Sequence, residues 1–352
     1  MDQDKVNAFA EQLIAEVNTA MSCLNLYLGH RLGLYRALVE AGPATAAELA
    51  AHTNYSERYL REWLACMAVG GYVDHDPATG RFTLPPEHAV VLLDEDDPAY
   101  AGPYVCLIPS FAGILNPLLQ AFRTGGGVPF AAYGPDALEA LGATNRTMFV
   151  NDFVGKWLAV LPDTVQRLRA GGRVADIGCG TGWSSISLAM GFPAVRIDAV
   201  DPDGASLAAA QQNAAKMGID DRITFHLSPV ESAPLAPPYD LVTAFECIHD
   251  MAYPVAALRR MRAIVADDGV VLIADEAAGD TVEENRSAIG HLFYNVSVLH
   301  CLPQAMVFPG AAATGTAMGP STLRRYAQAA GFTSVDVLPI EHAFWRFYRL
   351  AP

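Results

Sequence analysis

A glycine-rich run in the second half of the chain is the first segment whose residue types could do chemistry. Residues 176–182 are Asp-Ile-Gly-Cys-Gly-Thr-Gly; they end an apolar run that starts at Arg173 and precede a helical pattern that starts at Trp183. A glycine turn between a strand and a helix lets backbone N–H groups approach a ligand at a helix N-terminus. Dinucleotide-binding folds share this pattern, so the glycines alone do not identify the ligand.

Two aspartates favour a cationic ligand that carries a ribose. Asp176, two positions before Gly178, would repel a pyrophosphate but attract a sulfonium. Asp201 ends the next apolar run, 25 residues later, where a carboxylate can hold both hydroxyls of a ribose. Asp201 could instead cap the helix that is expected from Ala205.

A histidine and an aspartate, His249 and Asp250, follow the fourth expected strand. An imidazole with a pKa near about 6.5 suits a base that takes a proton from a phenol or a hydroxyl. A structural histidine that caps a helix is the alternative. His300 lies 51 residues downstream of His249. Two histidines and one carboxylate form the ligand set of a divalent iron-type ion, although this spacing alone is weak support for a metal.

Alternating strands and helices position these residues. Between Arg173 and Asp275, short apolar runs bounded by turns alternate with helical patterns. This alternation predicts an α/β fold with a doubly wound, mainly parallel sheet and with ligands at the carboxyl ends of its strands. The strands are expected at 173–177, 195–200, 223–227, 239–245 and 270–275, with helices from 183, at 205–217 and at 254–265.

The first part of the chain predicts an α-helical winged-helix domain. Apolar residues recur every three or four positions over residues 5–40, and helical patterns at 44–50 and 57–69 precede a hairpin around 77–80. Residues 44–86 hold three arginines against five acidic residues, and a helix that reads DNA needs several phosphate contacts. Dimerisation, or packing over the substrate, is the expected role, and nucleic acid is not an expected partner.

The composition bounds the remaining possibilities. A chain of 352 residues, with 52% hydrophobic and 17% charged residues, is globular and long enough for two or three domains. Its net charge of −15 repels phosphate backbones and anionic lipids. Six scattered cysteines and a start without signal-peptide features predict reduced thiols in a cytoplasmic protein. The uncharged stretch 103–122 contains three prolines and is expected to be buried in the protein rather than in a membrane.

Together, the motifs resemble those of class I S-adenosylmethionine (SAM) dependent methyltransferases. The similarity rests on residues 176–182, Asp201, 239–242 and 245–250, and with the winged helix it covers nearly the whole chain. The architecture is similar to that of bacterial small-molecule methyltransferases, mostly from secondary metabolism, that form homodimers through winged-helix domains. Ser228 and the proline after it are a departure, because many members have an acidic residue there for the adenine. The resemblance implies a Rossmann-like sheet that binds SAM through Asp176, Gly178, Gly180, Gly182, Asp201, Phe245 and Glu246.

The resemblance leaves three activities open. In the first, which we favour, His249, Asp250 and His300 hold a divalent metal, Fe or Zn, as in similar 2-oxo-acid C-methyltransferases. The metal would bind a 2-oxo acid and stabilise the enolate that is methylated at the β carbon. In the second, His249 is the general base of an O-methyltransferase for a phenolic or hydroxyl substrate. His249 and Asp250 are the catalytic residues of either enzyme; the third possibility is a SAM-binding transcriptional regulator without catalysis.

We expect three parts: a winged-helix dimerisation domain at 1–95, a helical linker or substrate roof at 96–168, and the SAM-binding domain at 169–352. The acceptor pocket is expected between the middle helices and the strand ends. Aromatic residues there are more often plain core, and arginines more often pair at the surface. The candidate substrate-binding residues are Tyr104, Tyr133, Arg146, Trp157, Met251 and Tyr294.

Overall fold

The computed structural model describes residues 1–352, which form two compact units. Unit 1 comprises Met1–Ala112 and Pro135–Thr147, and unit 2 comprises Gly113–Gly134 and Met148–Pro352. The segment that we expected to form a separate roof is divided between these units, because the chain leaves unit 1 after Ala112, returns to it at Pro135 and leaves it again after Thr147.

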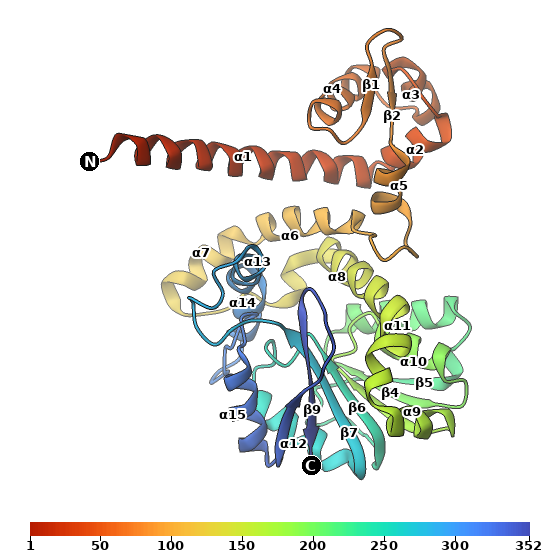
Figure 1. The fold of residues 1–352 in the computed structure, drawn as a ribbon, viewed down its shortest axis with the longest axis vertical. Coiled ribbons are helices and arrows are strands. Elements are labelled where there is room, and N and C mark those ends of the chain that lie inside the picture. The colour runs from red at the N-terminus through yellow and green to blue at the C-terminus, as the bar shows by residue number, and fades with distance from the viewer. The chain divides into compact units, whose positions relative to one another are not determined.

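Unit 1 is a winged helix preceded by one long helix (Figure 1). The long helix α1 begins after Asp2, whose side chain accepts hydrogen bonds from two amides of the first turn. The core of the unit joins α2, α3 and α4, with Leu38, Leu49 and Leu64 almost fully buried. The elements of unit 1 are α1 (Gln3–Arg31), α2 (Leu34–Ala41), α3 (Ala46–Thr53), α4 (Glu57–Val69), β1 (Asp74–Asp76), β2 (Arg81–Thr83), α5 (Pro86–Leu93), η1 (Gly102–Cys106), α6 (Leu107–Gly113) and α8 (Gly134–Met148).

Unit 2 is built on a seven-stranded sheet in the order β5-β4-β3-β6-β7-β9-β8. Strands β3 to β7 pair in parallel, and β9 is antiparallel to β7 and β8. The strands are β3 (Arg173–Ile177), β4 (Arg196–Asp201), β5 (Ile223–Leu227), β6 (Tyr239–Phe245), β7 (Val265–Glu276), β8 (Ser334–Val337) and β9 (Trp345–Ala351).

Helices cover both faces of this sheet, as Figure 1 shows. On one face, α9, α10 and the π-helix η3 bury the first of two hydrophobic cores, which includes Val174 of β3. On the other face, α12 and α15 bury a second core, which includes the next residue, Ala175. Successive residues of one strand thus face opposite layers. The helices of unit 2 are α7 (Leu115–Thr124), η2 (Phe130–Tyr133), η3 (Phe149–Trp157), η4 (Leu158–Val160), α9 (Pro162–Arg169), α10 (Trp183–Gly191), α11 (Gly204–Lys216), η5 (Asp220–Arg222), α12 (Pro254–Ile264), α13 (Ala288–Val296), η6 (Ser297–Cys301), α14 (Leu302–Ala305) and α15 (Pro320–Ala330).

The predicted α/β fold and winged helix are confirmed, with one correction. The uncharged stretch 103–122 is only partly buried, because Leu115, Leu119 and Phe122 of α7 are 47%, 53% and 74% exposed. A helix that is amphipathic can hold a charge-free sequence and still present one face to its surroundings. No single helix has the length and apolar character to cross a bilayer; Gly102–Gly113 and Leu115–Thr124 meet those criteria only when counted together as a bent pair.

Candidate functional site

The glycine loop joins the central strand β3 to α10. The amides of Gly178 and Cys179 donate to the carbonyl of Val200 in the neighbouring strand β4, at 2.8 and 3.1 Å. Gly178 and Gly182 have φ angles of 68° and 84°, in the left-handed region that favours glycine. A Cβ at position 178 would lie 2.8 Å from the Sγ of Cys247. Both the backbone angle and the close packing therefore require glycine at this position.

Asp176, the penultimate residue of β3, organises the loop. Its carboxylate is 1% exposed; Oδ2 accepts from the hydroxyls of Ser184 and Ser185 at 2.5 and 2.6 Å, and Oδ1 accepts from Thr243 at 2.7 Å. Burial raises the pKa of the carboxyl, and the three hydroxyls oppose that rise. Through these three hydroxyls the carboxylate ties α10 and β6 to the loop, and its attraction for a cationic ligand stays a prediction.

Asp201 ends β4 next to the loop. Its Oδ2 accepts from the amide of Gly180 and its Oδ1 from the amide of Asp203, both at 2.8 Å. Burial raises the pKa of Asp201 to about 6. The alternative role as a helix cap is taken by Asp203, whose side chain accepts from the amide of Ser206 at the start of α11. Asp201 therefore does not cap α11. Its side chain holds the amides of Gly180 and Asp203 at the carboxyl edge of the sheet.

Phe245 and Glu246 lie where β6 ends. The ring of Phe245 packs edge-on against Phe149 and Phe153 at centroid distances of 5.1 and 5.0 Å, so its side chain belongs to the core. Glu246 has a φ of 52°, which is uncommon for a residue with a side chain. Burial raises the pKa of the Glu246 carboxyl to about 7. Of the two predicted cofactor ligands, Phe245 could reach a ligand only through its backbone.

His249 is surrounded by three carboxylates. The imidazole is 1% exposed; its Nδ1 contacts Asp275 Oδ1 at hydrogen-bond distance and lies 3.1 Å from Glu276 Oε2. Its Nε2 lies 3.2 Å from Asp250 Oδ1. Asp275 and Glu276 end β7, so three consecutive strand ends of the sheet, β3, β6 and β7, converge on this region.

The charges of this cluster oppose its burial. Burial lowers the pKa of His249, but the carboxylates of Asp275, Glu276 and Asp250 outweigh it and raise the pKa well above the usual value. Burial also raises the pKa of Glu276 well above its usual value. For Asp250, burial raises the pKa, and the neighbouring His249 more than reverses this, so that the pKa is lowered. The cluster therefore favours an imidazolium at His249.

The possible metal ligands that gather most closely around His249 differ in part from the predicted set. The side chains whose ligand atoms gather within 4.8 Å of one another are His249, Asp250 and Cys301 in one group and His249, Asp275 and Glu276 in another. His300 is in neither group; its ring packs edge-on against Tyr133 at 4.6 Å. Cys301, the residue after His300 in the π-helix η6, contributes a possible ligand atom to the His249 cluster. The charges of His249 and Asp250 act on His300, and the three-ligand site of these residues stays a prediction.

The candidate substrate residues separate into several environments. Tyr104 and Arg146 belong to unit 1, where Arg146 pairs with Asp96 Oδ1 at 2.5 Å, the structural alternative considered for it. Trp157 is 2% exposed and packs against Trp345 and Phe347, so it is core.

Three further candidates lie in unit 2 with His249. Tyr133 is buried beside His300, and its hydroxyl donates to the carbonyl of Leu299 at 2.8 Å. Met251 is partly buried two residues after His249, whereas Tyr294 is 38% exposed on α13. Tyr133, beside His300, and Met251, next to Asp250 in the chain, therefore stay candidates for contact with an acceptor.

Asp275, Glu276 and Cys301 are the site residues that the sequence analysis missed. Asp275 and Glu276 form an acidic pair directly after the apolar residues 270–274. Paired carboxylates at the carboxyl end of a buried strand were a usable signal for function. Nothing in the sequence pattern distinguishes Cys301 from the other cysteines in apolar runs.

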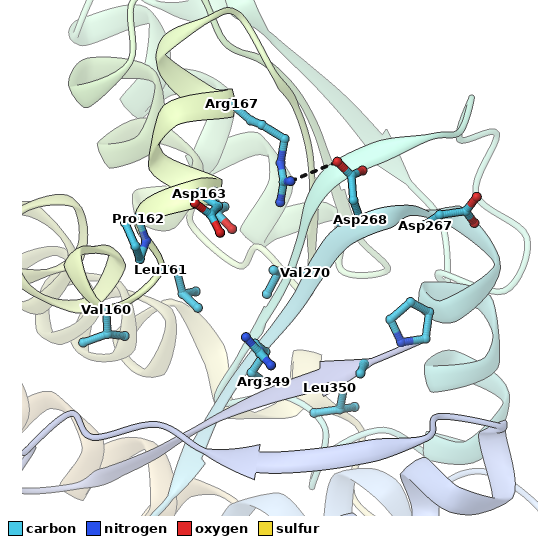
Figure 2. Close-up of a pocket in the computed structure, with 14 residues that line it drawn as sticks. Val160, Leu161, Pro162, Asp163, Arg167, Asp267, Asp268, Val270, Arg349 and Leu350 are labelled. Atoms are coloured by element: carbon cyan, nitrogen blue, oxygen red, sulfur yellow. Dashed lines mark hydrogen bonds and ion pairs between the residues drawn. The ribbon is translucent and has the colours of Figure 1, made fainter.

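The cavity drawn in Figure 2 lies elsewhere in unit 2. It has a volume of about 380 Å³ and is lined by residues of α9, the start of β7 and the end of β9. Arg167 reaches into it and binds Asp268 at 3.1 Å. Because β7 is parallel to the other core strands and β9 is antiparallel to it, this cavity is at the amino ends of the strands. Ligands of open α/β sheets bind at the carboxyl ends, so we do not assign the chemistry to it.

The winged helix has few basic groups for DNA. The arginines of α4 each pair with an acid on the same helix, Arg58 with Glu62 at 2.5 Å and Arg61 with Glu57 at 2.8 Å. Arg81, on the wing, pairs with an acid of α3 at 2.7 Å. Phosphate binding would have to compete with all three pairs.

Comparisons with known proteins find a family match in each half of the chain. A family model described as an Rv2258c-like winged HTH domain matches residues 20–93, and one described as a methyltransferase domain matches residues 168–313. The 27-O-demethylrifamycin SV methyltransferase of Amycolatopsis mediterranei is 28% identical over 109 residues, which is 31% of this chain and 40% of that protein. The chain spans less than half the length of the curated relatives that it matches.

Solved structures share the fold over the whole chain. Mitomycin 7-O-methyltransferase is 20% identical, with a TM-score of 0.68 and 99% of each chain covered. Human N-acetylserotonin methyltransferase, solved with SAM, is 17% identical, with a TM-score of 0.69 and coverage of 100% of this chain and 98% of that one. Identities at this level establish the fold. With the two family matches, they show a winged-helix domain followed by a methyltransferase domain.

Proposed function

We propose that the chain is a SAM-dependent methyltransferase that acts on a hydroxyl group of a small molecule, with His249 as the general base. The observation that carries this proposal is the buried His249 imidazole, bound through Nδ1 to Asp275 at the carboxyl edge of the sheet. A histidine held through Nδ1 has Nε2 as the atom that takes a proton, and the acceptor hydroxyl has to approach Nε2 beside Asp250 Oδ1, which lies 3.2 Å from it. The mitomycin and rifamycin relatives support a small acceptor of secondary metabolism.

The glycine loop and Asp201 fit SAM as the methyl donor. At Gly180, with a φ of 52°, a Cβ would meet no atom within 4 Å, so the backbone is open on that side. Each oxygen of Asp201 accepts one amide and keeps further acceptor capacity for ribose hydroxyls. Bound SAM supplies an already activated methyl group. The task of the chain is then alignment of the reacting groups, which is worth up to about 11 kcal/mol.

The carboxylates around His249 set its role. Asp275 fixes the ring through Nδ1, and the negative charges of Asp275, Glu276 and Asp250 favour the imidazolium that forms when Nε2 accepts a proton. The hydroxyl oxygen of the acceptor gains nucleophilic character as its proton leaves. Removal of the imidazole should therefore reduce methyl transfer by about 10² to 10⁴.

A methyl-transfer screen tests the proposed reaction. Purified protein is incubated with SAM labelled in its methyl group and with panels of phenols, alcohols and 2-oxo acids, each with and without chelator. We expect labelled O-methyl product that is insensitive to chelator and lost in His249→Ala. His291→Ala, at an exposed histidine of α13, is the matched control and should keep the activity of the wild type. Activity that survives in His249→Ala would exclude the proposed base.

The metal-dependent C-methylation of a 2-oxo acid is the second candidate. One observation favours it: buried oxygens of Asp250, Asp275 and Glu276 share one imidazole, and Asp275 Oδ2 has no hydrogen-bond donor, which a bound cation would satisfy. The structure gathers two sets of possible ligands around His249. One set adds Asp250 and Cys301, and the other adds Asp275 and Glu276. Fe or Zn at near-stoichiometric level in gently purified protein, with chelator-sensitive methylation of 2-oxo acids, would establish this alternative over the first.

A homodimer is proposed from α1. Its exposed face carries a continuous row of apolar side chains, 43% to 70% exposed, at steps of three and four residues. Rows of this kind are typical of helices that pack against a partner. The row consists of Phe9, Leu13, Val17, Met21, Leu24 and Leu28, with Ile14 beside it.

A SAM-binding transcriptional regulator without catalysis is the remaining alternative. The paired arginines of α4 and of the wing argue against it. Salt-sensitive binding to genomic fragments in a gel-shift assay, without methyl transfer to any acceptor, would favour the regulator.

A further inference from the structure

The side chains proposed to act on the acceptor are closed off from solvent. His249 is 1% exposed, and His300 and Cys301 are each 4% exposed. An acceptor hydroxyl has to come within about 3 Å of Nε2 of His249 for proton transfer. Some segment of the protein must therefore move before an acceptor can bind.

One segment joins both parts of the chain that supply these side chains. Residues 306–316, which we term the strap, run from the end of α14 toward α15. At one point the amide of Ala312 donates to the carbonyl of Ala252, and the hydroxyl of Tyr253 donates to the carbonyl of Pro309, both at 2.8 Å. Ala252 and Tyr253 follow His249 by three and four residues.

The far end of the strap is fixed to η6. The amide of Thr316 donates to the hydroxyl of Ser297 at 3.2 Å, and Ser297 begins the π-helix that carries His300 and Cys301. The strap thus bridges the His249 segment and the His300 segment. Movement of the strap away from Ala252 and Tyr253 would remove this bridge between the His249 segment and the His300 segment.

The strap has the backbone and the exposure of a segment that can open. Gly310, Ala313 and Gly315 have φ angles of 71°, 49° and 75°, so three of its residues are in the left-handed region. Tyr253, which donates to the strap, is 46% exposed, and Phe308 of the strap is 53% exposed, so these two apolar rings are only partly buried. Segments with few buried contacts and exposed hydrogen bonds open at low free energy.

We propose that the strap is a gate over the His249 site, held shut by the Tyr253–Pro309 and Ala312–Ala252 hydrogen bonds, and that its opening admits the acceptor. The role of the opening in acceptor entry rests on the proposed function. The opening of the strap, and its control by these two hydrogen bonds, which we term the latch, do not rest on the proposed function.

Hydrogen exchange measured by mass spectrometry tests the latch. Tyr253→Phe removes one hydrogen bond and keeps the ring, so the opening equilibrium of the strap should rise by roughly two- to tenfold. We expect faster exchange of amides in residues 310–313 by this factor, with an unchanged melting temperature. Tyr59→Phe, at a tyrosine that is 81% exposed in unit 1, is the control and should leave exchange unchanged. Unchanged exchange of the strap in Tyr253→Phe, or acceleration spread evenly over unit 2, overturns the proposal.

Chemical modification tests whether the gate controls access. Above neutral pH an imidazole with a pKa near about 6.5 is mostly neutral, so the ring of His300 should react with diethyl pyrocarbonate once it is exposed. In Tyr253→Phe the modification rate of His300, normalised to exposed His291, should rise by the same factor as strap exchange. An unchanged rate at His300 would show that the strap opens without exposing the site and would overturn the gate. Neither measurement uses methyl transfer, so absence of activity would remove the proposed function and leave the gate standing.

Discussion

Substitution of Gly178 by alanine tests the packing of the glycine loop most sharply. The residue has a φ of 68°, and an added Cβ would lie 2.8 Å from Cys247 Sγ and 2.9 Å from Cys247 Cβ. Gly180, two positions later, provides a matched control, because it also has a positive φ, 52°, but an added Cβ there meets no atom within 4 Å. The two variants therefore share the backbone strain and differ in the collision.

The expected magnitudes follow from these two terms. The left-handed backbone costs an alanine about 1–2 kcal/mol at either position. The forced contact with Cys247 adds about 1–3 kcal/mol, because it is directed at a side chain that is packed inside unit 2. Gly178→Ala should thus lose about 2–5 kcal/mol of unfolding free energy and Gly180→Ala about 1–2 kcal/mol. In a domain of 150–250 residues, each kcal/mol lowers the melting temperature by about 2–4 °C.

Differential scanning calorimetry and titration with S-adenosylhomocysteine measure both effects. We expect a clearly larger fall in melting temperature for Gly178→Ala. Gly180→Ala should instead lower the affinity for S-adenosylhomocysteine by at least about tenfold, because the methyl group of the alanine would enter the space that is open to a ligand. Equal melting temperatures of the two variants would refute the close packing of the loop against Cys247. Full affinity in Gly180→Ala would refute the assignment of its open side to the donor.

Further predictions concern titration and assembly. If His249 is the base, kcat should increase with pH as the imidazolium, whose pKa the carboxylates raise, loses its proton. Asp275→Asn removes one carboxylate and should move this rise in kcat to lower pH by about one unit or more. A rise at the same pH in the variant would exclude the Asp275 carboxylate as the cause. The pKa of Asp201 is raised to about 6, and ribose hydroxyls donate to its ionised form, so affinity for S-adenosylhomocysteine should fall about tenfold between pH 7 and 5 as the carboxylate gains its proton. Calorimetry of Asp201→Asn should give weaker binding without that pH dependence, and an identical pH profile in the variant would assign the titration to another group. Leu13→Glu, in the middle of the apolar row of α1, should convert dimers to monomers in light scattering, whereas Glu11→Gln should not; a monomeric wild type would contradict the proposed dimer.

The sequence predicts the sheet well because its strands are apolar runs between recognisable turns. The predicted strand at 223–227 coincides with β5, and the one at 239–245 with β6. Strands β8 and β9 were not expected, since they form an antiparallel pair at the edge of the sheet with charged residues among the apolar ones, as in Trp345–Ala351.

The side-chain partners in the site could not be predicted in the same way. Spacing located Asp176 and His249, but the contacts of Asp176 with two serines depend on the rotation of α10 against β3. The contact of His249 with Asp275 likewise depends on which strands are neighbours, because 26 residues separate the two. His300 was expected in the metal set, and the sequence pattern did not indicate that the next residue, Cys301, also reaches the His249 cluster. Tertiary geometry decides each of these contacts.

Calorimetric titration of the purified wild-type protein with SAM and S-adenosylhomocysteine tests the central claim, which is that residues 176–182 and Asp201 bind the adenosyl donor. We predict saturable binding of both compounds at one site per chain, with affinity reduced in Asp201→Asn. No detectable binding of either compound to folded protein, or equal binding by Asp201→Asn and the wild type, would contradict the account.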